Sequence, residues 1–125
     1  MMTDHTGKAY VTNDWGVTLA EFTLRHRRSN DSSQQEMTTW TSIAPGEKVG
    51  PLKFKYSTGI ASPKDYWWVS FRTHSGEIFT CKDGFYCSVS SDDDGNVNIS
   101  VHLDSKSMTV SFSSSSGCRV AIEKV

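Results

Sequence analysis

Long hydrophobic runs are absent from this chain of 125 residues. No window reaches the roughly eighteen consecutive apolar residues of a membrane-spanning helix, and residues 1–7 lack the apolar stretch of a secretory signal. We therefore expect a protein that stays in the cytoplasm or is released without a recognisable signal peptide. A leader that is missing from the sequence as given is the alternative.

An excess of charge of one sign is also absent. The chain has 13 basic and 14 acidic residues, for a net charge of −1, and the two signs are mixed along it. Such a balance argues against a nucleic-acid partner, because binding to phosphate backbones relies on concentrated positive charge. The densest basic run, 25–28, is interpreted first as a strand end entering a solvated loop, with a phosphate site as the alternative.

Helical periodicity is missing as well, since no window of a dozen residues holds an apolar stripe with a spacing of 3.6 residues. Runs of β-branched and aromatic residues recur instead between clusters of Gly, Pro, Asn, Asp and Ser, which is typical of short strands. The expected strands are 9–15, 17–26, 37–43, 49–56, 66–74, 77–81, 85–89, 96–103, 107–112 and 118–123. We predict one all-β domain over 1–125, an antiparallel β-sandwich, with a small β-barrel as the alternative.

Sequence patterns of catalysis are scarce. The four histidines stand singly, without the short spacings of a zinc site, and no G-x-S-x-G motif is present. No set of acid, base and nucleophile has a spacing that restricts the choice of residues. We therefore expect a protein that is not an enzyme, with no catalytic residues.

Cysteine is rare, and its count of three is odd. Cys81 and Cys87 bracket five residues and are close enough in sequence to form a disulfide in an oxidising environment. Two reduced cysteines on paired strands are the alternative. Cys118 alternates with Val120 and Ile122, so it is predicted to be a packed free thiol on the buried face.

Acidic residues gather at Asp92, Asp93 and Asp94, followed by Gly95 and Asn96. Clustered carboxylates are suitable ligands for Ca²⁺, which makes calcium the one candidate cofactor. The spacing differs from that of an EF-hand loop, and the pair Asp94-Gly95 is also a good hairpin turn without any ion. Both interpretations, the metal site and the turn, stay open from the sequence.

Aromatic residues are the strongest functional signal, and they concentrate between Asp65 and Cys87. Alternation along a strand places Trp67 on one face and Tyr66, Trp68 and Arg72 on the other, so a core accounts for only one of the two adjacent tryptophans. Aromatic faces stack on sugar rings and lie at membrane interfaces. Burial between two sheets is the alternative. The predicted ligand-binding residues are Tyr66, Trp68, Arg72, Phe85 and Tyr86.

Several motifs together resemble a known family. These are H-R-R-S-N-D from His26, D-Y-W-W-V-S-F from Asp65, C-K-D-G-F-Y-C from Cys81 and S-D-D-D-G from Ser91. The combination resembles the up-regulated-in-Daf-two domain, found in fungi and nematodes as small stand-alone proteins, and it spans nearly the whole chain. That family is named for expression behaviour, so the resemblance implies no reaction and no catalytic residues. It does imply that the aromatic-rich segment from Asp65 to Cys87 and the acidic turn at Asp92 to Asp94 belong to one pattern.

These observations predict a non-enzymatic binding module that recognises a glycan or a lipid headgroup on a membrane surface. Calcium assistance and a membrane-active, toxin-like role in defence are narrower versions of the same hypothesis. The alternative is a structural or stress-related protein that self-associates through the exposed aromatic face and has no small ligand. The first hypothesis predicts a monomer and the second a homodimer.

Overall fold

The computed structural model describes residues 2–125 and shows nine strands within them. They are β1 (Met2–Asp14), β2 (Leu19–Arg28), β3 (Gln35–Ile43), β4 (Lys48–Gly59), β5 (Asp65–Thr73), β6 (Ile78–Cys81), β7 (Asn96–His102), β8 (Ser107–Ser111) and β9 (Cys118–Lys124). A one-turn 3-10 helix, η1 (Ser32–Gln34), precedes β3. The prediction of an all-β domain is confirmed. None of the helical structure in residues 2–125 is long and apolar enough to cross a membrane.

All nine strands belong to one sheet with the order β3-β2-β5-β6-β9-β8-β7-β1-β4. Neighbouring strands in this sheet are antiparallel, except for β1 and β7, which pair in parallel from Lys8 and Asn96 onward. The expectation of an antiparallel sheet therefore needs a correction at this one pair. The alternation of side chains is the same in parallel and antiparallel strands, so the sequence pattern carries no signal for this difference.

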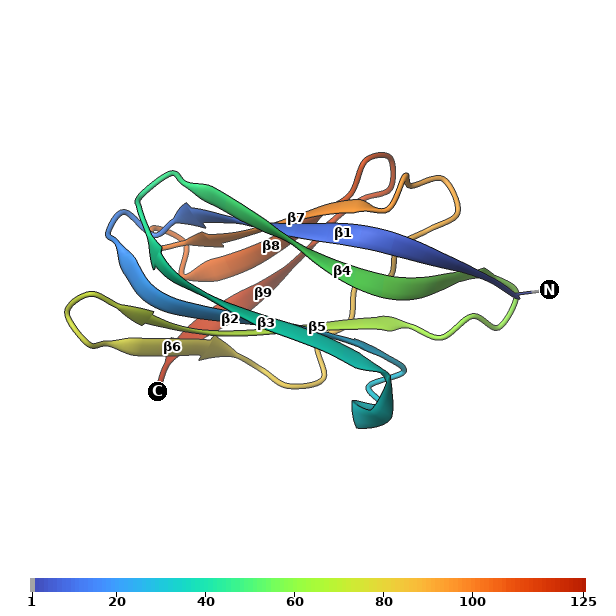
Figure 1. Cartoon of the computed structure of the whole chain (residues 1–125), viewed down its shortest axis with the longest axis horizontal. Coiled ribbons are helices and arrows are strands. Elements are labelled where there is room, and N and C mark those ends of the chain that lie inside the picture. The colour runs from blue at the N-terminus through green and yellow to red at the C-terminus, as the bar shows by residue number, and fades with distance from the viewer. Residues whose placement is uncertain (1) are drawn as a thin grey trace.

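The sheet folds over on itself, so that one half (β4, β1, β7, β8) faces the other (β3, β2, β5, β6), with β9 running between them (Figure 1). The free edges, β3 and β4, approach each other and nearly close the sheet. The Glu36 side chain of β3 spans this gap and accepts a hydrogen bond of 2.9 Å from the backbone N–H of Lys55 in β4. This nearly closed arrangement fits the small β-barrel alternative.

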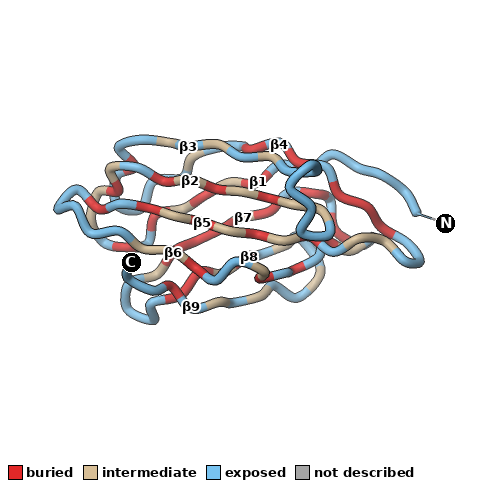
Figure 2. The backbone as a smooth tube through the Cα atoms, turned by 90° about the horizontal axis from the view of Figure 1, so that it is seen from below, coloured by how far each residue is buried: buried red, intermediate tan, exposed pale blue. Residues whose placement is uncertain are grey.

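The core lies between the two halves and follows the predicted alternation. Along the strands, buried residues alternate with more exposed ones (Figure 2). In β7, Val97, Ile99 and Val101 are almost completely buried. Burial of each such side chain stabilises the folded state by about 1.5–3 kcal/mol. In the expected strand over 96–103, alternation would continue this row to Leu103, but β7 ends at His102 and Leu103 is 43% exposed in the following turn.

Two expected strands differ from the structure. β1 begins at Met2, well before residue 9, because its first residues pair with the second half of β4. The expected strand over 85–89 is wrong, since only Tyr86 forms a bridge, to Tyr66. The backbone after Tyr86 is instead held by the Asp65 side chain, whose carboxylate accepts a hydrogen bond from Val89 N–H.

The cysteine predictions are also corrected. Cys87 forms a disulfide with Cys118, and Cys81 is the buried free thiol. Cys81 faces the core from β6 and lies opposite Ile122, far along β9 from Cys118, whereas the chain after β6 carries Cys87 to the start of β9. Burial raises the pKa of the Cys81 thiol, which favours its neutral form.

Candidate binding surface on the outer face of β2 and β5

Six side chains form one surface on the outside of the sheet, which we call the aromatic–basic face. β2 and β5 contribute two residues each, and the loops before β5 and after β6 contribute one each. The members of the face are Arg25, Arg27, Lys64, Tyr66, Trp68 and Tyr86. On the opposite side of the same strands His26, Asp65 and Trp67 are buried, as strand alternation requires.

Cations and aromatic rings are interleaved on this face. Arg25 lies directly across from Trp68, and its guanidinium carbon is 4.9 Å from the indole centroid. The ammonium of Lys64 lies 4.1 Å from the centroid of the Tyr86 ring. The rings of Tyr66 and Tyr86 are neighbours at 5.8 Å. Such cation–π contacts help to hold Trp68 and Tyr86 in place, and Tyr86 is the most exposed of the three rings.

The charge of the face is positive. Arg25 forms an ion pair of 2.6 Å with Asp83. Arg27 hydrogen-bonds instead to neutral side chains, including Gln35 at 2.9 Å. Within residues 2–125, neither Arg27 nor Lys64 has a carboxylate within 4.0 Å. Asp31, in the loop after β2, also interacts with Arg27 over a longer distance. The face therefore keeps an excess of positive charge, an arrangement that attracts an anionic group.

The structure brings together three of the five predicted ligand-binding residues: Tyr66, Trp68 and Tyr86. Tyr86 is 51% exposed, and the other two are half-buried. Arg72 lies on the same side of β5 but further along the strand, where it approaches Glu21 at 3.8 Å. Phe85 is buried in the core, which corrects its prediction as a ligand contact. Arg25 and Arg27 belong to the basic run 25–28, for which a phosphate site was the alternative, but their approach to the aromatics depends on the pairing of β2 with β5. Lys64 was not predicted.

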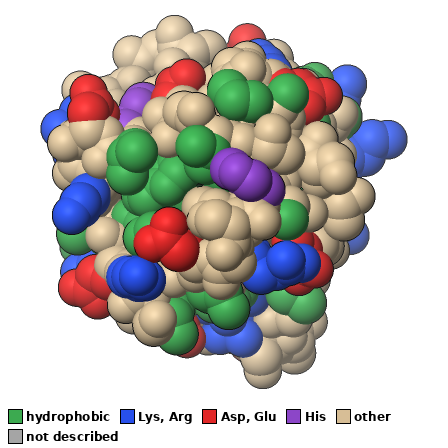
Figure 3. Space-filling model, turned by 90° about the vertical axis from the view of Figure 1, so that its left-hand side faces the viewer, with side chains coloured by type: hydrophobic (Ala, Val, Ile, Leu, Met, Phe, Trp, Pro, Cys, Tyr) green, Lys and Arg blue, Asp and Glu red, His purple; other side chains and the backbone are tan. Residues whose placement is uncertain are grey.

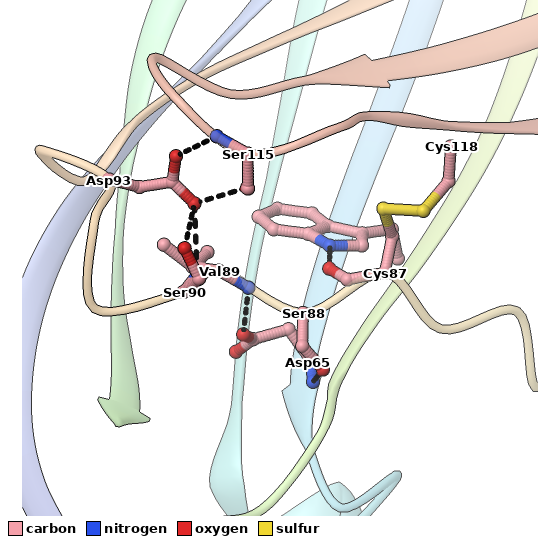
Figure 4. Close-up of a disulfide and its surroundings, with 9 residues drawn as sticks. Asp65, Cys87, Ser88, Val89, Ser90, Asp93, Ser115 and Cys118 are labelled. Carbon is pink, nitrogen blue, oxygen red and sulfur yellow. Dashed lines mark hydrogen bonds between the residues drawn. A yellow bond between two sulfur atoms is a disulfide. The ribbon is translucent and has the colours of Figure 1, made fainter. Parts of the chain in front are cut away.

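The acidic turn forms hydrogen bonds within the protein. The Asp93 carboxylate accepts bonds from Ser90 N–H at 2.9 Å, Ser115 N–H at 2.8 Å and the Ser115 hydroxyl at 2.6 Å (Figure 4). Burial disfavours the charge, but these bonds outweigh it and hold the pKa of Asp93 well below its ordinary value. Asp93 therefore joins the loop that follows β6 to the loop between β8 and β9.

The same bonds bear on the calcium prediction. Both carboxylate oxygens of Asp93 already accept hydrogen bonds, and Asp94 accepts one from Asn96 N–H in its own turn. Across residues 2–125, no three His, Cys, Asp or Glu side chains gather in a way that could hold a metal ion. Binding of calcium by Asp92, Asp93 and Asp94 stays a prediction.

A buried ionic network lies directly beneath the aromatic–basic face. The imidazole of His26 lies between two carboxylates, with Nδ1 at 2.8 Å from Glu36 and Nε2 at 2.8 Å from Asp65. Burial lowers the pKa of His26, but its bonds to Asp65 and Glu36 outweigh burial, and the net effect raises the pKa. The signal for this network was alternation itself, because a histidine between Arg25 and Arg27 must face inward and needs polar partners there.

Asp65 extends this network to the loop that carries Tyr86. Its carboxylate accepts a bond of 2.9 Å from Val89 N–H, and its backbone carbonyl accepts one of 2.9 Å from Cys87 N–H (Figure 4). The indole N–H of Trp67 donates to the Cys87 carbonyl at 2.9 Å. Together with the disulfide to Cys118, these bonds fix the backbone next to Tyr86, so that the aromatic–basic face is largely pre-formed.

His26 does not offer a free base beneath the aromatic–basic face. Both ring nitrogens of His26 are occupied by carboxylates, so this imidazole has no free nitrogen with which to accept a proton from a substrate. The aromatic–basic face offers flat rings for stacking and cations for pairing with an anion.

We compared the chain with known proteins. No family model matches it, and no curated protein matches its sequence. The resemblance of its motifs to the up-regulated-in-Daf-two domain therefore stays a prediction.

Proposed function

We propose that this protein is a non-enzymatic binding module whose aromatic–basic face recognises an anionic sugar, either in a glycan or in a lipid headgroup. The observation that carries this proposal is the interleaving of three aromatic side chains with three cations on one face, where only Arg25 forms an ion pair within 4.0 Å in residues 2–125. Monomeric proteins normally bury or scatter their large aromatic side chains, so their grouping at a positive surface needs a partner.

The division of labour within the face follows from the geometry. The rings of Tyr66, Trp68 and Tyr86 provide apolar surface against which the C–H face of a sugar ring can stack. Arg27 and Lys64 supply N–H donors to a carboxylate, sulfate or phosphate, because in residues 2–125 no carboxylate oxygen lies within 4.0 Å of either cation. Arg25 is engaged with Asp83 and Trp68, so its role is to hold the indole in place.

The test is binding of the purified protein to glycan arrays and to liposomes of defined headgroup, in calcium and in EDTA. The arrays separate a free glycan from a lipid-borne one, and EDTA tests the calcium prediction. We expect selective binding to anionic sugars that Trp68→Ala weakens at least about tenfold, since loss of a stacking aromatic at the centre of an interface costs about 2 kcal/mol or more. Arg27→Gln should weaken the binding of anionic ligands and leave the binding of neutral ligands unchanged.

Arg72→Gln is the matched control, because Arg72 projects from the same side of β5 but is engaged near Glu21, away from the ring cluster. A result in which Arg72→Gln weakens binding as much as Trp68→Ala would contradict the assignment of the face. The self-association hypothesis predicts a different outcome. It requires a size that depends on protein concentration, that Trp68→Ala reduces, and that no glycan changes.

A further inference from the structure

A cavity of about 340 Å³ lies at the end of the molecule that carries the β5–β6 hairpin and the carboxyl terminus. We call it the barrel-end cavity. It lies near Thr73, at the opposite end of β5 from Tyr66, so it is separate from the aromatic–basic face. Figure 3 looks onto this end and shows hydrophobic side chains gathered near its centre, with charged side chains around them.

Apolar side chains form the interior of the barrel-end cavity. Trp15 and Ile122 are buried in the core, and Phe79 packs against it. Leu103 at the rim is 43% exposed, an unusual environment for a leucine that strand alternation predicts to be inside. A volume of this size is at the lower end of the range for small-molecule sites, which occur preferentially in the mouths of barrels.

Of the two lysines that line the opening, only Lys124 has a carboxylate partner among the described residues. Lys124 forms an ion pair of 3.1 Å with Glu77. The Thr73 hydroxyl is engaged with the Ser75 hydroxyl at 3.0 Å and with Glu77 N–H at 3.2 Å. Lys106 has no carboxylate within 4.0 Å in the described part of the chain, although it lines the cavity. Two lysines and one glutamate give the lining a net charge of +1.

The backbone holds Lys106 at this position. Its carbonyl accepts a hydrogen bond of 2.8 Å from Ile122 N–H, and its own N–H donates to the Leu103 carbonyl at 3.2 Å. The tight turn after β7 is therefore tied to β9, and a cationic side chain starts from a fixed point beside the apolar interior. A cation at the edge of an apolar cavity matches a ligand with an apolar body and one acidic group.

We propose that the barrel-end cavity binds a small monocarboxylate with an apolar body, whose carboxylate pairs with Lys106 and whose body contacts Trp15, Phe79 and Leu103. The proposal is independent of glycan binding by the aromatic–basic face, since the two sites share no residue.

The test uses octanoate, with octylammonium as the probe of equal chain length and opposite charge, and 3-phenylpropionate to distinguish an aromatic body from an acyl chain. Amide NMR spectra of the full chain should show saturable shifts at 79, 103, 106 and 122 with octanoate, with a Kd of about 1 mM or below. Octylammonium should bind at least about fivefold more weakly. Absence of saturation, or equal binding of both probes, overturns the proposal.

Two variants sharpen the test. Lys106→Gln keeps a long side chain at the same position. It should weaken the binding of octanoate about fivefold, which is the upper end of what a partly exposed ion pair contributes. It should also remove the preference for octanoate over octylammonium. Leu103→Ser should also weaken the binding of octanoate, because it removes an apolar contact at the rim without adding a charge or disturbing the buried core. Lys53→Gln, on the exposed outer side of β4, is the control and should leave binding unchanged. Unchanged octanoate affinity in Lys106→Gln contradicts the assignment of the carboxylate.

Discussion

The two sides of β5 carry adjacent tryptophans in opposite environments. Trp67 is 1% exposed, contacts the ring of His26 and donates a hydrogen bond to the Cys87 carbonyl. Trp68 is half-buried on the outside and is held by the guanidinium of Arg25. The inner side is fully buried and fixes loop positions, while the outer side presents a partly exposed surface, so we expect it to contribute less to folding.

The comparison is tested most directly by truncating each tryptophan. Trp67→Ala leaves a cavity and removes the hydrogen bond to Cys87, so we expect the free energy of unfolding to fall by about 3–5 kcal/mol. Trp68→Ala removes a ring that is only partly buried against the core and against Arg25, so we expect a smaller loss of about 1–2 kcal/mol. Urea unfolding followed by circular dichroism measures both. Similar losses in the two variants would remove the distinction between the inner and outer sides.

The disulfide provides the next test, because it joins the loop beside Tyr86 to β9. Cys87 and Cys118 are separated by 31 residues, and removal of a cross-link over a loop of that length is expected to cost about 3–4 kcal/mol. Cys118→Ser should show this loss in urea unfolding. It should also weaken ligand binding at the aromatic–basic face, since the loop becomes less ordered.

The control for this test is the addition of a reductant. It should destabilise the wild-type protein by a similar amount and leave the Cys87→Ser, Cys118→Ser double variant unchanged. A loss of stability without any effect on binding would mean that the hydrogen bonds to Asp65 alone hold the loop.

The smallest expected effect concerns pH and the buried network. The pKa of His26 is raised in the folded protein, so its contribution to stability is fully present below the unfolded value of about 6.5. The contribution is lost as the pH rises through the folded pKa, since the unfolded chain then releases a proton that the folded protein still holds. Between pH 5.5 and 8, the urea midpoint of the wild type should therefore decrease with increasing pH.

Two variants separate His26 from the other histidines. His26→Gln should be less stable at low pH and should lose most of this pH dependence, whereas His74→Gln, at an exposed position, should keep it. Ionisation of the Cys81 thiol in the unfolded chain, whose ordinary pKa is about 8.5, lowers stability in the same direction near pH 8. The His26→Gln variant keeps this contribution, so the difference between the variant and the wild type reports His26. A midpoint that is flat across this range would contradict a protonated His26 in the folded protein.

Sequence reasoning was most successful for local features. The alternation in 66–74 and 96–103 correctly predicted strands and assigned Trp67 and Trp68 to opposite faces. It failed where the chain leaves a strand, at Leu103 and at Phe85, because burial there depends on the path of a turn or loop. The buried partners of His26 were also beyond reach, since Asp65 and Glu36 come from two different neighbouring strands.

The sequence by itself determined an all-β domain and the orientation of each strand's two faces, because alternation is a local property with a period of two residues. Only the tertiary structure decided that Cys87 pairs with Cys118, that β1 runs parallel to β7, and that Lys64 lies over Tyr86. These features depend on which strands are neighbours. Side-chain alternation is identical for every choice of neighbour, so the packing of the whole chain decides among them.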